Sequence, residues 1–325
     1  MTYRQAFARA GLVLLALCAS PVIHAQAYPD RPVKLIVPSG PGGGYDFVAR
    51  VLSDKLSETL GQPLVVENRA GAGTTLGTQV ALAAPADGYT LMMGGISNIV
   101  FNSALYKSLP YDPLKEFVPI SLVAKYPYTM VASKGLPLNT LGDIIAYARS
   151  NPDKLSIATV GTGTGQQVLA AVLMSMANIR MLQVPYKSAQ AVYPDLISGR
   201  VDLFIDATPG ARPHIDSGRV KGVVSVSTER TAAYPDLPGT REAGLPGFAL
   251  DSWYGLFARK GTPPAVIERL RAAAGKALSD PEMRARLEGN GAEVLQLNPQ
   301  QTQKFVEAEY TKWTALIRQA GITAD

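Results

Sequence analysis

Short runs of Val, Ile and Leu alternate along the chain with longer stretches whose apolar residues recur at helical spacing. Runs that are apolar on both faces are typical of strands covered by helices on each side of a sheet. We expect strands at 33–38, 64–68, 89–95, 128–133, 155–160, 182–186, 201–206, 220–227 and 253–259. The pattern predicts an α/β protein whose sheets are largely parallel.

The longer stretches predict helices between these strands. The first, at about 46–60, has one apolar face and ends at Gly61, a residue that commonly terminates helices. Pro110, Pro113 and Pro119 predict an irregular segment. Further helices are expected after the turn at 71–77 and at 141–149, 165–176, 189–197, 209–217, 264–278, 281–287 and 299–320.

The amino terminus has the pattern of a secretory signal peptide. Arg4 and Arg9 precede an apolar run at 11–19, and small residues follow up to Ala27. The run is far shorter than the ~20 residues of a membrane-spanning helix. We therefore expect residues 1–27 to be removed and the mature protein to be periplasmic.

The remaining length predicts two lobes, because single cores stop growing at about 250–300 residues. The strand and helix alternation restarts near residue 128, and the last three helices carry no turn chemistry of their own. We assign residues 28–126 plus 252–325 to lobe 1 and residues 127–251 to lobe 2. Chain crossings near 125–128 and 250–253 would form a hinge.

Composition argues against several classes of function. Cys18 lies in the predicted signal peptide and follows Leu17, where a lipoprotein signal needs a small residue, so neither a lipid anchor nor cysteine chemistry is expected. The mature chain has one histidine, His214, and no GxSxG, HExxH or Walker motif. We expect His214 to have a structural role at its helix, with contact to a ligand as the alternative. Its basic residues are scattered. We predict no enzyme activity, metal, cofactor or nucleic-acid partner.

Three glycine-rich turns each follow a strand and open a helix, at 41–46, 71–77 and 161–167. Free N–H groups and the positive end of the helix dipole favour a carboxylate or phosphate at such turns. None has the GxGxxG spacing of a dinucleotide site. The first and third turns fall in different lobes, so an anion with two ends can bridge them, whereas the second either packs its helix or contacts ligand.

Polar side chains near the strand ends are candidates for ligand contact. Asp46 either binds ligand or caps its helix, and Asp206 is expected in the cleft, directly or through water, because a carboxylate needs a partner or solvent. The other candidates are Tyr45, Ser97, Asn98, Thr162, Thr164 and Gln167.

The order of several motifs resembles the receptors of tripartite tricarboxylate transporters, also called Bug proteins. These motifs are YPDRPVKLIVPSGPGGGYDFVARVL, LGQPLVVENRAGAGTTLG, APADGYTLMMG, LSIATVGTGTG, VPYKSAQAVYPDLISGRVDLFID and TREAGLPGFALDSWYGLFARKGTPP. The resemblance implies a type II periplasmic-binding-protein fold and a carboxylate held between two lobes. It also implies delivery to a permease with one large and one small integral membrane subunit, and no cofactor. We expect the protein to be a monomer.

The resemblance also implies ligand-contacting residues. In the family the PGGGxD and GxGT turns offer amides and hydroxyls to a carboxylate, often through water. The residues that match are Gly42, Gly43, Gly44, Asp46, Thr162, Gly163 and Thr164, with Asp206 ending VDLFID.

Two positions depart from the family pattern. Tyr45 stands where members usually have a small residue, and Gln167 where they often have histidine. Tyr45 either offers a flat face to an aromatic or extended dicarboxylate or faces solvent. A receptor that signals to a sensor kinase is an alternative to transport. An enzyme with a nucleotide cofactor is disfavoured by the signal peptide, the missing GxGxxG and the near absence of histidine.

Overall fold

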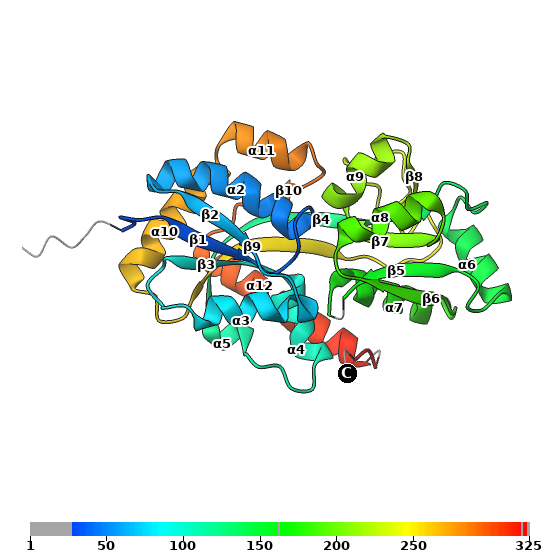
Figure 1. Ribbon diagram of the computed structural model, residues 1–325, viewed down its shortest axis with the longest axis horizontal. Coiled ribbons are helices and arrows are strands. Elements are labelled where there is room, and N and C mark those ends of the chain that lie inside the picture. The colour runs from blue at the N-terminus through cyan, green and yellow to red at the C-terminus, as the bar shows by residue number, and fades with distance from the viewer. Residues whose placement is uncertain (1–27, 162, 320, 324–325) are drawn as a thin grey trace, which may run out of the picture.

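The computed structural model describes residues 28–161, 163–319 and 321–323, which form two α/β lobes (Figure 1). The predicted signal peptide, residues 1–27, lies outside the described residues. Within the described chain, none of the helices combines the length and the apolarity needed to cross a bilayer. The α/β class predicted from the sequence is confirmed.

The strands run in the order β2-β1-β3-β9-β4-β7-β5-β6, and β8 and β10 also pair with β4. The first lobe contains β1, β2 and β3, and the second contains β5, β6, β7 and β8 (Figure 1). The strands are β1 (Val33–Val37), β2 (Leu64–Asn68), β3 (Thr90–Gly95), β4 (Phe117–Ser133), β5 (Ser156–Val160), β6 (Leu182–Tyr186), β7 (Leu203–Ala207), β8 (Val220–Ser225), β9 (Asp251–Arg259) and β10 (Glu293–Val294).

Helices cover these strands, and most begin within two or three residues of the predicted positions. The helices are α2 (Gly44–Leu60), α3 (Thr75–Ala83), α4 (Asn102–Leu105), α5 (Pro113–Glu116), α6 (Leu141–Ser150), α7 (Gly165–Ala177), α8 (Ala189–Ser198), α9 (Thr208–Asp216), α10 (Pro264–Leu278), α11 (Pro281–Glu288) and α12 (Pro299–Gln319), with the 3₁₀ turn η1 (Ala72–Thr74) and the π-helix η2 (Ile96–Phe101).

Two long strands, β4 and β9, connect the lobes. They pair antiparallel, and the pairing includes Tyr126 with Ser252 and Pro127 with Asp251. Beyond this point β4 continues into the second lobe, where it pairs with β7 and β8. The two expected chain crossings are therefore hydrogen-bonded neighbours. The assignment of residues 28–126 plus 252–325 to one lobe remains a prediction.

The expectation of largely parallel sheets is wrong at the centre of the molecule. The pairs β1–β2, β1–β3, β5–β6 and β5–β7 are parallel. Every described pairing that involves β4 or β9 is antiparallel. The reason is that β4 and β9 carry the chain between the lobes in opposite directions.

The expectation of an irregular segment around Pro119 is also wrong, because β4 begins at Phe117. Proline has no N–H to donate, so within a sheet it is tolerated at edges and bulges. Here the register of β4 against β9 shifts between Pro119 and Ser121 and again between Leu122 and Ala124. These irregularities allow a strand to continue through a sequence that reads as a loop.

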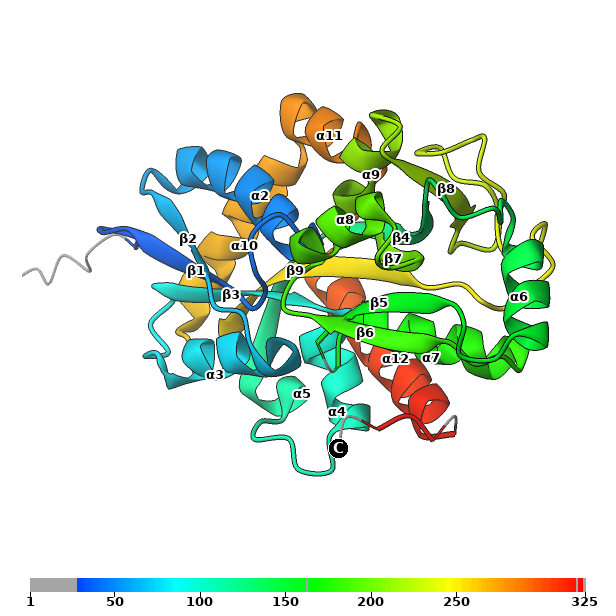
Figure 2. The ribbon, with the colours of Figure 1, turned by 45° about the vertical axis from the view of Figure 1, so that its right-hand side comes forward.

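The carboxy-terminal helices pack on the first lobe. Helix α10 lies against α2, and Leu270 joins Leu52 and Leu56 in one buried cluster (Figure 2). Helix α12 contacts η2 and α4, with the Trp313 and Phe101 rings 5.7 Å apart. The end of the chain thus completes the core built by its beginning.

Truncating Leu270 tests this packing. Leu270 is fully buried, so Leu270→Ala should lower the free energy of unfolding by about 2–5 kcal/mol in a urea titration. The matched control is Leu316→Ala on α12, whose side chain is 45% exposed and whose loss should cost under about 0.5 kcal/mol. Equal effects of the two substitutions would contradict the packing.

Candidate functional site

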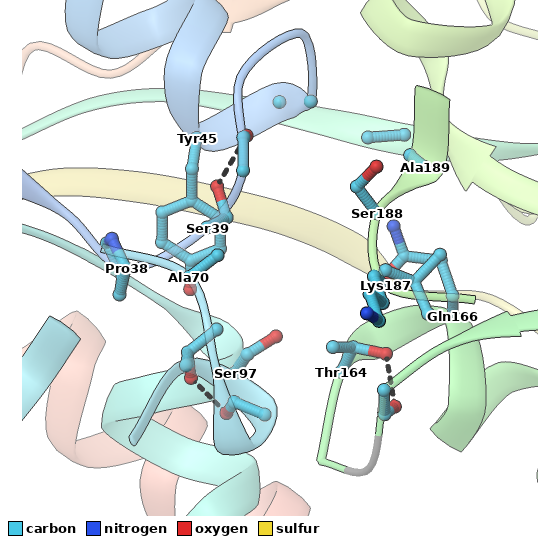
Figure 3. A pocket seen from close by; sticks show the side chains of 18 of the residues that line it. Pro38, Ser39, Tyr45, Ala70, Ser97, Thr164, Gln166, Lys187, Ser188 and Ala189 are labelled. Carbon is cyan, nitrogen blue, oxygen red and sulfur yellow. Dashed lines mark hydrogen bonds between the residues drawn. The ribbon is translucent and has the colours of Figure 1, made fainter. Parts of the chain in front are cut away.

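A cavity of about 450 Å³ lies between the lobes, where the parallel strands end. Ligands bind α/β sheets at these carboxyl ends. Figure 3 shows Ser39, Tyr45 and Ser97 on one wall and Thr164, Gln166, Lys187 and Ser188 on the other. The lining residues are Pro38, Ser39, Gly40, Gly43, Gly44, Tyr45, Ala70, Gly71, Ala72, Gly73, Thr74, Ser97, Tyr128, Val160, Gly161, Thr164, Gln166, Tyr186, Lys187, Ser188, Ala189, Ala207 and Tyr254.

In the first lobe, residues 42–46 form the α2 turn. Gly42 has a φ of +82°, a conformation that favours glycine. The N-cap residue is Gly43, so no side chain caps the helix, and its first N–H groups are available to an anion. Asp46 accepts hydrogen bonds from Gly42 N (3.0 Å) and Arg50 Nε (2.9 Å).

These contacts give Asp46 a bracing role. Asn68 Nδ2 also donates to it, over 2.9 Å. Burial opposes ionisation, but the bonds from Arg50, Gly42 and Asn68 outweigh it and lower the pKa of the Asp46 carboxyl. Asp46 is 4% exposed and is absent from the cavity lining. Its carboxylate therefore holds the turn rather than meeting the cavity.

In the second lobe, residues 163–167 form the α7 turn, which repeats the α2 turn. Gly163 also has a φ of +82°. Gln167 Oε1 accepts from Gly163 N over 2.7 Å, as Asp46 does from Gly42. Gln167 thus braces its turn and does not line the cavity. Gln166, at the position equivalent to Tyr45, does.

Each connecting strand contributes one tyrosine, and each of these tyrosines lies beneath one of the two turns. A Cβ added at Gly44 would lie 2.2 Å from the Tyr254 hydroxyl, and one at Gly165 would lie 1.9 Å from that of Tyr128. The first residue of each helix must therefore be glycine. Burial raises the pKa of both phenols, so they remain neutral at physiological pH.

Tyr45 forms part of the cavity wall. It is 8% exposed, its hydroxyl donates to Asn98 Oδ1 over 3.0 Å, and its ring meets that of Tyr254 edge-on with centroids 4.9 Å apart. The alternative that Tyr45 faces solvent is wrong, because these contacts fix the ring against the core.

Asp206 lies behind the cavity wall. It is fully buried and accepts hydrogen bonds from Tyr193 Oη (2.9 Å), Gln166 Nε2 (3.3 Å) and Ala207 N (2.9 Å). Burial raises the pKa of Asp206 to about 6. The expectation that Asp206 lies in the cleft is wrong, because protein groups satisfy its carboxyl inside the core, and it meets the cavity only through Gln166. His214 stacks on Tyr193 with ring centroids 3.6 Å apart, which agrees with a structural role.

The structure brings some of the predicted site residues into the cavity and leaves others outside it. The lining includes Gly43, Gly44, Tyr45, Ser97 and Thr164. Behind it lie Gly42, Asp46, Asn98, Gly163, Gln167 and Asp206, and Thr162 lies outside the described residues.

Sequence reasoning missed Gln166, Lys187 and Ser188. Lys187 and Ser188 follow β6, so the rule that strands end at the site would have found them. Tyr128 and Tyr254 gave no such signal, because they lie inside apolar runs of β4 and β9. Among the lining residues, Lys187 is the one that carries a full charge, and none of them is a carboxylate.

Known proteins are similar to this chain in sequence and in architecture. The family model described as "Tripartite tricarboxylate transporter family receptor" matches residues 48–322. Protein BugT of Bordetella pertussis is 32% identical over 322 residues, covering 99% of each chain.

Several solved structures are similar, and two of them are named with a ligand. Rpa4515 of R. palustris with adipate has a TM-score of 0.87 and 32% identity, covering 91% of this chain and 99% of that one. MatC from Rhodopseudomonas palustris with bound malate has a TM-score of 0.85 and 34% identity, covering 89% and 100%. These findings confirm the predicted periplasmic-binding-protein fold. The chain belongs to the tripartite tricarboxylate transporter receptors, the Bug family of periplasmic solute-binding proteins.

Proposed function

We propose that this protein captures a small dicarboxylate between the α2 and α7 turns in the periplasm and delivers it to a membrane permease. The observation that carries the proposal is the pair of equivalent turns facing one cavity. Among the described residues that line the cavity, one is a lysine and none is a carboxylate. Such surroundings favour anions over cations and neutral solutes.

Two turns favour a ligand with two anionic ends. A helix amino terminus attracts one carboxylate through its free N–H groups, so two such termini suit a dicarboxylate. Adipate and malate, named with the two similar structures, are both dicarboxylates. A volume of about 450 Å³ is within the range of pockets for small molecules, ~300–1,000 Å³. An aromatic dicarboxylate, packed on Tyr45, belongs to the same class.

Closure of the lobes would trap the ligand. Across the cleft, Gln190 Nε2 of α8 donates to the Gly42 carbonyl over 2.9 Å. The α7 turn likewise lies close to the first lobe, since a Cβ added at Gly163 would lie 2.5 Å from Asn102 Oδ1 of α4. A ligand that contacts both turns binds the closed form more tightly, and therefore shifts the population towards it. We assign the motion to the β4–β9 crossings at 125–128 and 250–253.

The partner of the closed form would be a permease with one large and one small integral subunit. Removal of residues 1–27 would place the mature protein in the periplasm to meet it. Capture without chemical change makes the protein a receptor and not an enzyme. Signalling to a sensor kinase is the alternative outcome of closure, and uptake of a labelled dicarboxylate by cells with and without this gene separates the two.

Asp206 would support ligand binding indirectly. Its carboxyl holds the Gln166 amide, and Gln166 faces the cavity beside Thr164 (Figure 3). A side chain positioned in advance loses less conformational freedom when a ligand binds. The buried acid thus fixes one polar contact of the site without touching the ligand.

Blocking the α2 turn should abolish binding without unfolding the protein. No atom lies within 4 Å of a Cβ added at Gly43, so Gly43→Leu should fit, and its side chain would fill the space before the amides. In thermal-shift assays with C4 to C6 and aromatic dicarboxylates, the wild type should gain ~2.7 kcal/mol at 100 times the Kd. Gly43→Leu should gain none.

The matched control is Gly135→Leu, since Gly135 also has no atom within 4 Å of an added Cβ and lies outside the cavity lining. It should keep the full ligand response. The diesters of the same acids should stabilise neither protein. A stabilised Gly43→Leu variant, or a wild type that responds to no dicarboxylate, would refute the proposal.

Asp206→Asn should change how stability depends on pH. The folded protein holds the Asp206 proton up to pH about 6, against an ordinary carboxyl pKa of 3.8. Between these values the unfolded chain has already lost its proton. The contribution of Asp206 to stability is therefore present at low pH and is lost as pH rises through about 6.

The size of this effect follows from the shift of about two pKa units, which corresponds to ~3 kcal/mol. The free energy of unfolding of the wild type minus that of Asp206→Asn should thus fall by this order between pH 4 and pH 7 in urea titrations. Asparagine can accept from Gln166 and Ala207 and donate to Tyr193, so the contacts persist. Parallel pH curves would show that Asp206 titrates normally.

A further inference from the structure

We infer that Lys187 pairs with one carboxylate of the ligand and makes the two ends of the site unequal, so that the ligand binds in one orientation. This inference rests on the proposed capture of a dicarboxylate. It assigns the charged contact to a side chain of β6–α8 in the second lobe, whereas the first lobe offers backbone amides and no free cation in the lining.

The two lobes are equivalent strand by strand, which identifies the counterpart of Lys187. In the first lobe, Val33 pairs with Leu64 and Val37 with Asn68. In the second, Ser156 pairs with Leu182 and Val160 with Tyr186. Both parallel strand pairs, β1–β2 and β5–β6, therefore consist of five residue pairs in the same register. The residue that follows β2 is Arg69, and the residue that follows β6 is Lys187.

Arg69 is neutralised within its own lobe. Its Nε donates to Glu67 Oε1 over 2.7 Å, and its Nη2 contacts the same oxygen. Arg69 is not part of the cavity lining, although the next residue, Ala70, is. The first lobe thus has a cation at the edge of the site and pairs it with an acid two residues earlier.

Lys187 has no such partner. The position equivalent to Glu67 is Pro185, which carries no charge. Among the described residues, no carboxylate oxygen lies within 4.0 Å of the Lys187 ammonium. The second lobe therefore places an unneutralised positive charge in the wall of the cavity.

The neighbours of Lys187 complete an anion site. Figure 3 shows it on the wall with Gln166, Thr164 and Ser188. Gln166 is held by Asp206, and Thr164 is the N-cap of α7. A carboxylate on this wall would meet an ammonium, a fixed amide and a helix amino terminus. On the facing wall it would meet the α2 amides and the Tyr45 ring.

This asymmetry has consequences for selectivity. A carboxylate paired with a full charge gains more binding free energy than one held by dipoles alone. In an unsymmetrical ligand, the carboxylate that forms the stronger ion pair would therefore face Lys187. The other end would lie against the α2 turn, where the ring of Tyr45 limits the space. The charge would also favour doubly charged ligands over their half-esters.

Isothermal titration calorimetry with succinate, malate, adipate and phthalate tests the inference. For each ligand that the wild type binds, Lys187→Met should raise the Kd about 10- to 100-fold, the size of one charge-assisted contact. Lys187→Arg should stay within a few-fold of the wild type. Lys304→Met, at an exposed position of α12, is the matched control and should leave the Kd unchanged.

A second variant keeps Lys187 but neutralises its charge with a neighbouring acid. Pro185→Glu would recreate in the second lobe the acid that neutralises Arg69 in the first, and should also raise the Kd. Its control, Gln183→Glu, places the same charge two residues earlier on β6 and should have a much smaller effect. Melting curves without ligand should match the wild type for all five variants.

The half-ester of the best ligand distinguishes the possible results. Its affinity should fall less on Lys187→Met than that of the diacid, because its retained carboxylate can use the α2 turn. If the wild type binds a dicarboxylate, and Lys187→Met and Pro185→Glu bind it with unchanged affinity, the inference about Lys187 is overturned and the proposed function stands. A wild type that binds none of the dicarboxylates would overturn the proposed function and this inference with it.

Discussion

The antiparallel pairing of β4 with β9 is the interaction on which the site depends. These strands provide the connection between the lobes, and each also contributes a tyrosine to the floor of the cavity. Tyr254 lies under the first residue of α2, and Tyr128 under the first residue of α7. Because both rings project from one ladder of hydrogen bonds, the two helix amino termini rest on the strands that connect the lobes and not on loops.

Local signals in the sequence were sufficient for most of the elements and for the place of the site. Glycine turns after apolar strands identify the amino termini of α2 and α7, and the position of the cavity agrees with that expectation. Roles within the turns were not predictable in this way. The sequence allows Asp46 to bind ligand or to cap its helix, and it predicts Asp206 in the cleft because a carboxylate needs solvent or a partner. Hydrogen bonds from Arg50, Asn68 and Tyr193 instead satisfy both carboxylates inside the protein.

The errors about strands have one common cause. Pairing direction and tolerance of proline depend on which strands become neighbours, and β4 and β9 are far apart in the sequence. Pro119 is compatible with a strand here because the register shifts beside it. The place of Lys187 after β6 was predictable from the sequence, but its importance was not. Its significance is visible only when β6 is superposed on β2 and the acid that neutralises Arg69 is found to have no counterpart.

The hydrogen bond from Gln190 to the Gly42 carbonyl spans the cleft without involving the cavity. Its contribution to the closed form is therefore the same whatever solute is bound. Part of the closing free energy is thus intrinsic to the protein. The barrier to release then has a component common to all solutes, to which each ligand adds the contribution of its own contacts.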